Sequence, residues 1–430
     1  MQRTQYLLVF SHIMSNTPST KGILQAKKKL EGICDVTPLK LNQTLSDEID
    51  SKIYLKREDL QTVRSYKIRG AYNFISQLSV KEKKSGVVCA SAGNHAQGFA
   101  YSCNLLKIKG IVFMPAPTPK QKVEAVRRIG KEFIEVILSG DTYDDAKTAA
   151  LKYISIHKKT FVPPFDHALI IEGQGTVAVE ILEQMGKKKI DYLFVPIGGG
   201  GLAAGIITYF KEFSPKTKII GVEPLGAPAM QLSIKKNKVV TLDKIDNFVD
   251  GAAVKQVGQI TFPICKDYLE EVILVPEGRI CTKIMQMYNS DAIVLEPAGA
   301  LSIAALNYYQ DKIKGKNVVC VISGGNNDIG RMPDIKERSL IFEGLKHFFI
   351  IKFPQRAGAL KQFVSKVLSP NEDITLFEYT KKNSKESGPA LVGIELKHKE
   401  DYEPLIKRMH KYKVDFVPLN DNPMLFNFLI

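Results

Sequence analysis

The sequence predicts an α/β core followed by a smaller α+β domain. From about residue 85 to residue 322, short apolar runs alternate with stretches of helical periodicity. After about residue 340 the pattern changes to a series of strand, helix, strand, strand, helix and strand. The chain has 430 residues, which is too long for one ordinary core and suits two or three domains.

The strands of the first part are expected to be buried on both faces, because each run is apolar throughout. These runs are 87–90, 111–114, 133–138, 192–197, 218–222, 272–275 and 318–322. Helices are expected from about Ala96, over 119–129, and after Asp141, which we expect to cap the third helix. Strands that alternate with helices indicate parallel pairing. Ligands of such sheets bind in the loops after the carboxyl ends of the strands.

The C-terminal part predicts a ferredoxin-like unit, because its elements follow the order βαββαβ. The expected strands are 347–353, 374–379, 391–396 and 414–417, the helices are 359–368 and 401–410, and a polar turn covers 381–388. The polar stretch 331–338 is interpreted as a connector. We therefore expect a catalytic domain over 21–335, a second domain over 336–430, and an unstructured extension over 1–20, with Met14 as an alternative start.

Composition argues against several classes of protein. The net charge is +15, but lysines spread along the chain supply most of it, without a nucleic-acid-binding motif. The sequence has no apolar run of about 18 residues, so we expect no membrane span. The six cysteines form no metal-ligand pattern and no disulfide framework. We therefore expect a cytoplasmic protein that binds neither nucleic acid nor membrane.

A lysine in the segment SYKIRG, residues 65–70, is the first candidate for chemistry. Lys67 can form a Schiff base only as a free amine, which requires a dry or electropositive setting. A surface lysine whose stem lies over an apolar patch would explain the same residues.

The segment SAGNHAQG, residues 91–98, lies where a predicted strand turns into a helix. Ala92 and Gly93 are small enough to let a ligand approach the backbone, and a helix N-terminus offers N–H groups to an anion. Ser91, Asn94 and His95 add polar side chains. The alternative is an ordinary turn that Ser91 or Asn94 caps, with His95 in a structural role.

Four consecutive glycines stand between another strand and helix. The loop consists of Gly198, Gly199, Gly200 and Gly201, followed by Leu202. Such a run has a high entropic cost and packs nothing, so a backbone nest that wraps a phosphate explains it better than a bare turn. It is not a nucleoside-triphosphate loop, because no Lys-Ser/Thr pair follows, and it lacks the context of the dinucleotide fingerprint.

Ser323 follows the last strong strand and presents a hydroxyl at a strand end. Together the segments supply one lysine, one phosphate nest, one anion-binding turn and one hydroxyl. A phosphorylated aldehyde cofactor requires these parts.

In order and spacing, these motifs resemble those of the threonine dehydratases. The matching segments are SYKIRGAY, SAGNHAQGFA, PIGGGGLAAG and ISGGNND. Members of this family are pyridoxal phosphate (PLP) enzymes of fold type II, which the tryptophan synthase β chain shares. FIIKFPQRAGALKQF, DITLFEYTKK and ESGPALVGIEL resemble the ACT-like regulatory domain of the short biosynthetic form. The resemblance, over about residues 30–425, implies a core of two subdomains with mostly parallel sheets and one ACT-like domain.

The resemblance also implies roles for the candidate residues. Lys67 would carry the cofactor and move the Cα proton, and Tyr66 would lie against the cofactor ring. Asn94 would meet the 3-hydroxyl group, and Ser323 the pyridine nitrogen. The phosphate would be held by Gly198, Gly199, Gly200, Gly201 and Leu202. The substrate carboxylate would be received by Ser91, Ala92, Gly93, Asn94 and His95.

The implied reaction converts L-threonine to 2-oxobutanoate and ammonia, the first step of isoleucine biosynthesis. The implied effector is an amino acid, expected to be isoleucine, and the implied assembly is a homotetramer. A serine dehydratase or serine racemase on the same scaffold is the alternative, because discrimination of one methyl group is worth only about 1–3 kcal/mol. A non-catalytic amino-acid sensor is a third possibility, against which the intact Lys67 and glycine loop argue.

A divalent metal is not expected. Some relatives bind one near a Glu-x-x-x-Ala-x-Asp pattern, whereas the matching stretch here is EPLGAPA, residues 223–229. The aspartate is missing and Glu223 is the only carboxylate, while a hard cation requires several oxygen ligands.

Overall fold

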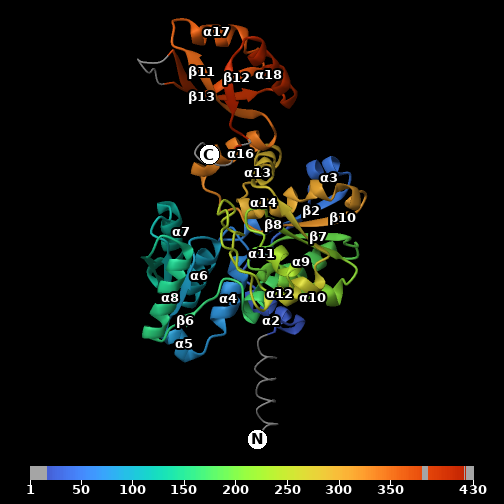
Figure 1. Cartoon of the computed structure of the whole chain (residues 1–430). Helices are drawn as coiled ribbons and strands as arrows, with labels where there is room; N and C mark the ends of the chain where they lie inside the picture. The colour runs from blue at the N-terminus through green and yellow to red at the C-terminus, as the bar shows by residue number, and fades with distance from the viewer. Residues whose placement is uncertain (1–16, 380–385, 421, 423–430) are drawn as a thin grey trace. The chain divides into compact units, whose positions relative to one another are not determined.

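The computed structural model describes residues 17–379, 386–420 and 422, and it forms two units (Figure 1). The first unit contains Met1–Pro276 and Ser290–Asn327, and the second contains Glu277–Asn289 and Asp328–Ile430. The expected boundary after residue 335 would put residues 277–289 in the core, whereas the structure groups them with the C-terminal unit.

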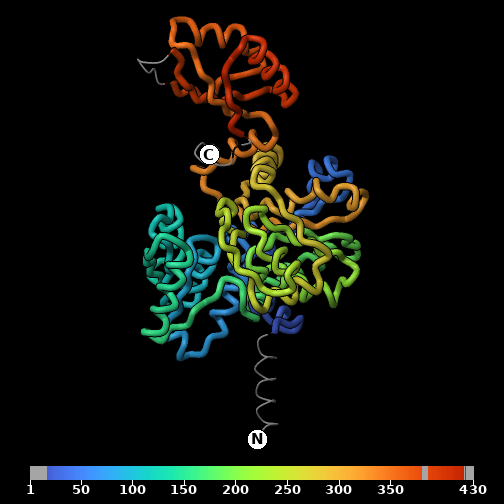
Figure 2. Tube along the Cα trace, in the orientation of Figure 1, coloured from blue at the N-terminus to red at the C-terminus, as the bar shows by residue number. Residues whose placement is uncertain are grey.

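A six-stranded sheet forms the larger part of the first unit, in the order β1-β2-β10-β7-β8-β9. Its strands are β1 (Leu39–Leu41), β2 (Lys52–Arg57), β7 (Tyr192–Pro196), β8 (Lys218–Pro224), β9 (Glu271–Val275) and β10 (Asn317–Ile322). All neighbours pair in parallel except β1, which is the antiparallel edge. Because β10 lies between β2 and β7, the blue segment that contains β2 runs beside the orange β10 (Figure 2). Sequence analysis did not predict β1 or β2.

A smaller parallel sheet has the order β5-β4-β3-β6. Its strands are β3 (Val87–Ala90), β4 (Gly110–Met114), β5 (Ile134–Leu138) and β6 (Thr160–Phe161). Helices α6 (Asn94–Leu106), α7 (Lys120–Gly130) and α8 (Tyr143–His157) connect and cover them (Figure 1). Every residue of β3 and β4 is buried, as expected for strands covered on both faces. The predicted α/β core with two mostly parallel sheets is confirmed.

Further helices surround the two sheets. They are α2 (Thr20–Leu30), α3 (Gln43–Ile49), α4 (Lys67–Ser76), α5 (Val80–Ser85), α9 (Ala168–Met185), α10 (Gly201–Phe213), α11 (Ala229–Lys235), α12 (Thr261–Tyr268), α14 (Pro297–Ala304) and α15 (Gln310–Ile313), with 3₁₀ turns η1 (Glu58–Leu60), η2 (Lys131–Phe133) and η3 (Leu306–Tyr308). The long helix α9 is buried over most of its length and packs against α2, α4 and α10. It therefore forms the centre of the unit.

The second unit contains the predicted ferredoxin-like fold. Its elements are β11 (Lys346–Pro354), α17 (Ala359–Lys366), β12 (Glu372–Tyr379), β13 (Ser387–Leu396), η5 (Lys399–Asp401), α18 (Tyr402–Lys411) and β14 (Asp415–Pro418). The sheet is antiparallel, in the order β12-β13-β11-β14, and Phe349, Phe353 and Phe363 lie in its core. Residues 381–385 of the predicted polar turn, 381–388, lie outside the described residues, and residues 387–388 belong to β13.

The connector predicted over 331–338 is largely helical. These residues lie in η4 (Ile329–Arg331) and α16 (Met332–Phe342). Pro333 occupies the first turn of α16, where a helix has no use for the missing N–H group. Helix α13 (Glu277–Asp291) packs against α16 so closely that a Cβ atom on Gly278 would lie 2.4 Å from Phe342.

Two expected helix starts also differ. Thr142, not Asp141, caps α8: its hydroxyl accepts from the Asp145 N–H group, and the Asp145 side chain accepts from the Thr142 N–H group. The predicted N-terminal extension over 1–20 overlaps α2, which Ser19 caps. Residues 1–16 of that prediction lie outside the described part of the chain.

Two further observations concern the environment of the chain. All six cysteines are free thiols. Within the described ranges, every helix is too short or too polar to cross a membrane.

A buried cluster of four charged residues lies beneath the start of α4. Arg69 donates to Glu58 at 2.8 Å and to Glu180 at 2.6 Å, and Lys56 also donates to Glu180. Each of the four residues is at most 4% exposed. Burial raises the pKa of Glu58, but the charges of Arg69 and Lys56, together with hydrogen bonds from Arg69 and Thr37, bring that pKa below its ordinary value. The cluster joins β2, η1, α4 and α9, so its pairing fixes their relative positions.

We expect Glu180→Gln to destabilise the fold by about 3–5 kcal/mol, because it leaves Lys56 and Arg69 buried with one counter-charge too few. The midpoint of urea unfolding, followed by far-ultraviolet circular dichroism, measures this loss. Glu270→Gln, which breaks the exposed pair with Lys218, is the matched control and should leave the midpoint unchanged. Equal midpoints for both variants would contradict the prediction.

Candidate active site

Lys67 is the first residue of α4, and its position is fixed by pairing with the loop after β10. Ser65 forms an antiparallel bridge with Gly324, and the Tyr66 N–H group donates to the Ser323 carbonyl at 3.2 Å. The predicted lysine and the predicted strand-end serine are thus neighbours. The Ser323 side chain is buried, and its hydroxyl donates to the Ala298 carbonyl at 3.2 Å.

The Lys67 amine lies in a setting that favours its neutral form. Its Nζ atom donates to the Pro164 carbonyl at 3.0 Å and lies 5.4 Å from the centre of the Tyr66 ring. Burial lowers the pKa of Lys67 to about 8, and the nearby carboxylate of Glu296 limits the fall. A lysine with this pKa supplies a substantial fraction of free amine near neutral pH, which surface lysines do not.

The turn after β3 brings Asn94 and His95 to the same region. Asn94 begins α6, and the Gly93 N–H group donates to the Ser91 hydroxyl at 3.2 Å. Helix α6 lies directly on the start of α4, because a Cβ atom on Gly98 would come within 3.0 Å of backbone atoms there. The first-turn N–H groups of α6 have no partner within the helix, so they can receive an anion.

His95 is a structural histidine. Its Nε2 atom lies 3.0 Å from the Val162 carbonyl, which can only accept, so the ring nitrogen carries the proton. Burial and then the charge of Lys67 lower the pKa of His95 to about 3. The ring therefore stays neutral at physiological pH and is already hydrogen-bonded, so His95 can contribute its backbone N–H group but not a titrating side chain.

The glycine loop joins β7 to α10. The expectation that the glycine run packs nothing is wrong, because close packing requires these glycines. A Cβ atom on Gly199 would lie 2.4 Å from the Phe165 ring, and one on Gly201 would lie 3.0 Å from the same residue. Gly200 has a φ of 91°, which other residues rarely adopt. The loop is closed from the other side by Thr261, whose hydroxyl donates to the Gly199 carbonyl at 2.6 Å.

In this loop a Cβ atom on Gly198 would lie 3.0 Å from the Ala252 carbonyl oxygen, and Leu202 is buried in the first turn of α10. Gly201, Leu202 and Ala203 carry the first-turn N–H groups of a 13-residue helix, which have no partner within the helix. An anion placed there would meet both these donors and the positive end of the helix dipole.

A short segment after β6, residues 162–165, links the separate motifs. The Val162 carbonyl meets His95, the Pro164 carbonyl meets Lys67, and the Phe165 ring supports Gly199. The sequence analysis did not single out this segment. Its Pro-Pro pair signals a loop, but nothing in the pattern reveals which side chains that loop touches.

Asn94 takes part in a second group of polar residues that sequence analysis missed. Its Nδ2 atom donates to Glu296 at 2.6 Å, and its Oδ1 atom accepts from Asn326 at 2.7 Å. Burial and then the charge of Asp250 raise the pKa of Glu296 to about 7, while hydrogen bonds from Asn94 and from the Asn326 backbone act in the opposite direction. The structure therefore brings Lys67, Tyr66, Asn94 and Ser323 together around a buried carboxyl group.

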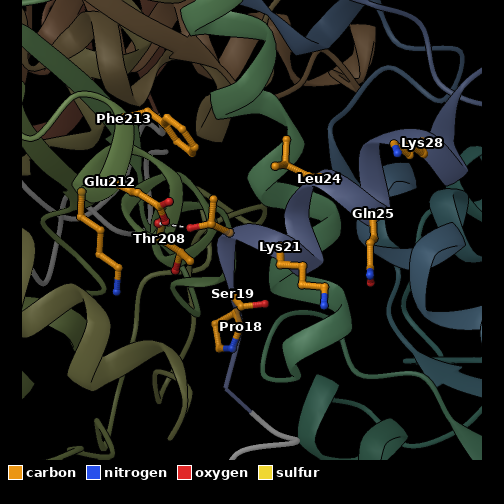
Figure 3. Close-up of a pocket in the computed structure, with 11 residues that line it drawn as sticks. Pro18, Ser19, Lys21, Leu24, Gln25, Lys28, Thr208, Glu212 and Phe213 are labelled. Atoms are coloured by element: carbon orange, nitrogen blue, oxygen red, sulfur yellow. Dashed lines mark hydrogen bonds between the residues drawn. The ribbon is translucent and has the colours of Figure 1, made fainter.

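A surface groove of about 750 Å³ lies elsewhere in the first unit (Figure 3). It is formed by the start of α2, including Ser19 and Leu24, and by the end of α10, including Thr208 and Phe213. It is lined by none of the predicted site residues, so we do not assign it to the chemistry.

Glu223, the one carboxylate of the stretch compared with metal sites, serves as a helix cap. It accepts from the N–H groups of Met230 at 2.7 Å and Gln231 at 2.9 Å. Among the residues that the structure describes, no three His, Cys, Asp or Glu side chains gather as a metal site would require.

Two protein-family models match this sequence. The model described as "Pyridoxal-phosphate dependent enzyme" matches residues 31–324. The model described as "C-terminal regulatory domain of Threonine dehydratase" matches residues 337–429.

Similar proteins agree with these models. L-threonine dehydratase biosynthetic IlvA of Halalkalibacterium halodurans is 58% identical over 410 residues, which cover 95% of this chain and 99% of that protein. Threonine deaminase isoform 2 from Solanum lycopersicum, in its processed form, has a TM-score of 0.69 and 39% identity, covering 76% of this chain and 96% of that one. Serine racemase from Dictyostelium discoideum has a TM-score of 0.67 and 32% identity, covering 73% and 99%.

We expect the free amine of Lys67 to appear at unusually low pH. In the ligand-free protein, acylation of Lys67 by a small neutral reagent should rise with pH to a midpoint near 8, because burial disfavours the charged form. Peptide mass spectrometry measures the extent at each pH, and surface lysines in the same digest provide the comparison, with midpoints near the ordinary value of about 10.4. A midpoint for Lys67 above 10 would contradict the prediction.

Proposed function

The chain belongs to the pyridoxal-phosphate-dependent enzymes, in the threonine dehydratase family, and we propose that it converts L-threonine to 2-oxobutanoate and ammonia. The observation that carries this proposal is Lys67, a buried amine of lowered pKa beside Ser323 and Asn94. The high identity over nearly the whole length of a dehydratase named as biosynthetic supports the same reaction.

The cofactor is pyridoxal phosphate, and the residues present fit it. When bound, the cofactor withdraws electrons from the substrate and so acidifies its Cα–H group. The aldehyde of the cofactor requires a neutral amine, and its phosphate requires a nest of N–H groups at a helix start. Its ring nitrogen requires a buried hydroxyl. One buried hydroxyl at this place, Ser65 Oγ, has no partner within the described protein.

Each candidate residue is given a role on this basis. We propose that Lys67 holds the cofactor, and then takes the Cα proton of threonine as a general base of suitable pKa. Tyr66 lies against the ring, and Asn94 donates to the 3-hydroxyl group. The phosphate is bound by the backbone of Gly198, Gly199, Gly200, Gly201 and Leu202. The substrate carboxylate is bound by the turn of Ser91, Ala92, Gly93, Asn94 and His95.

Ser323 is proposed to meet the ring nitrogen. Its hydroxyl, which donates to the Ala298 carbonyl in this structure, can rotate to donate to an unprotonated ring nitrogen, and it carries no negative charge. A neutral hydroxyl does not stabilise a protonated ring nitrogen as a carboxylate would. We infer that this arrangement favours prompt loss of the β-hydroxyl group over accumulation of negative charge on the ring.

A serine dehydratase or serine racemase activity is the second candidate. The 32% identity to a serine racemase favours this alternative, and a methyl group alone discriminates by only about 1–3 kcal/mol. The regulatory domain favours threonine, because feedback control suits a biosynthetic enzyme and the matching domain is described as belonging to threonine dehydratase.

The C-terminal domain is proposed to bind isoleucine and to reduce activity through it. An effector shifts an equilibrium only by its differential affinity for two states, so isoleucine must bind the less active state better.

We place the boundary of this domain near residue 335, between the residues that the two family models match. We also propose a homotetramer, from the family resemblance, and a cytoplasmic location, which six free thiols support.

The purified enzyme should form 2-oxo acid from L-threonine with a kcat/KM about 10-fold or more above that for L-serine, since the extra methyl group fills its pocket. L-Isoleucine should suppress this turnover. A coupled assay of 2-oxo acid, with and without isoleucine, measures both effects. A preference for serine, or racemisation without 2-oxo acid, would favour the second candidate, and insensitivity to isoleucine would remove the feedback proposal.

We expect Gly199→Ala to lower the affinity for pyridoxal phosphate by about 10-fold or more, because the added methyl group must displace Phe165 or the loop itself. Fluorescence titration of the cofactor-free enzyme measures the dissociation constant. Gly186→Ala is the control: it strains a backbone with a φ of 57° but meets no atom within 4 Å. It should leave the affinity unchanged, and equal losses in both variants would point to general destabilisation instead.

A further inference from the structure

Glu296 is a buried carboxyl group beside Lys67 that the reaction as described does not use. It lies at the N-cap position of α14, yet its side chain makes no capping hydrogen bond. It is only 5% exposed, and it accepts from Asn94 Nδ2 and from the backbone N–H group of Asn326. A carboxylate in such a place costs desolvation energy, so its partners and its role require an explanation.

The hydrogen bonds fix the orientation of every amide in this group. The Val63 carbonyl can only accept, so the atom of Asn326 that faces it at 2.9 Å is the amide nitrogen. That nitrogen also donates to Asn94 at 2.7 Å, which places the oxygen of Asn94 toward Asn326. The nitrogen of Asn94 must then face Glu296, and an acceptor stands there.

This series of hydrogen bonds leaves one N–H group of the Asn94 side chain available to a ligand. Its oxygen is occupied by Asn326, and one of its two N–H groups is occupied by Glu296. The remaining N–H group can only donate. Because hydrogen bonds in series polarise one another, a carboxylate at the end of the chain also holds the Asn94 amide more firmly than a neutral acceptor would.

Gly324 makes room for this carboxyl group. A Cβ atom on Gly324 would lie 2.3 Å from Glu296 Oε1. The SGGN motif therefore serves Glu296 as well as Ser323. The backbone that carries Ser323 and the side chain that holds Asn94 are in direct contact.

We propose that Glu296 is a positioning residue, whose carboxylate holds the Asn94 amide with one N–H group directed to the 3-hydroxyl group of the cofactor. This inference rests on the proposed function, because it takes Asn94 as the partner of that hydroxyl. Glu296 acts through Asn94 and does not touch the reacting atoms.

A double-mutant cycle on cofactor affinity tests the proposal. Glu296→Gln is isosteric and should weaken pyridoxal phosphate binding by about 10-fold, because glutamine carries no charge and has one acceptor oxygen for the two N–H groups of Asn94 and Asn326. In the background of Asn94→Ala the same substitution should have a much smaller effect, because only the influence of the Glu296 charge on Lys67 remains. Fluorescence titration of each cofactor-free variant gives the four dissociation constants.

Controls separate positioning from folding. Glu172→Gln alters another buried carboxyl group, which accepts from Ser19 and is 8% exposed, and it should leave cofactor affinity unchanged. Urea midpoints of all variants are compared with that of the wild type. Should Glu296→Gln fail to fold, Asn326→Ala releases the other end of the chain and is expected to give the same non-additive cycle with Asn94→Ala.

The outcomes are distinct. A wild-type chain that fails to bind pyridoxal phosphate would overturn both the proposed function and this inference. The inference alone would be overturned if the wild type binds pyridoxal phosphate and turns over threonine, but Glu296→Gln lowers cofactor affinity equally with and without Asn94. Unchanged affinity in Glu296→Gln would do the same.

Discussion

Arg69 determines where the reactive lysine lies. It follows Lys67 by two residues on α4, and its guanidinium group reaches Glu58 on one side and Glu180 of α9 on the other. Because all these charges are buried, α4 cannot shift without leaving one of them unpaired, at a cost of several kcal/mol. Close backbone packing acts in the same direction, since a Cβ atom on Gly173 of α9 would lie 2.6 Å from the Arg69 carbonyl. The position of Lys67 at the start of α4 is therefore fixed.

Both sheets contribute the rest of the site, which surrounds the start of α4. The small sheet supplies the turn with Asn94, and the large sheet supplies the glycine loop and Ser323. The three strands concerned, β3, β7 and β10, all end at their carboxyl sides in these loops, as ligand sites of parallel sheets do. The segment 162–165 and the carboxyl group of Glu296 join the contributions into one region.

The sequence was sufficient for the elements whose signal is local. Except for the two-residue strand β6, the strands of both sheets after residue 85 and the whole ferredoxin-like unit follow from apolar runs and periodicity, because burial dictates residue type. The helix over 332–342 was missed because its composition is polar, although Asp334 and Arg338 form an i,i+4 pair that favours helix. Glu296 was missed for a different reason: it is 202 residues from Asn94 in the chain, and only the packed fold brings the two together.

The loop that carries Gly251 and Ala252 is attached to the small sheet's helices by exposed ion pairs. Asp250 pairs with Lys122 of α7 at 2.6 Å, and Lys255 pairs with Asp144 of α8 at 2.8 Å. Both pairs are open to solvent, so dissolved ions screen them over a distance of about 8–10 Å. The hydrophobic cores of the two sheets are insensitive to such screening. Raising the ionic strength therefore weakens this attachment selectively and leaves the cores of the two sheets unchanged.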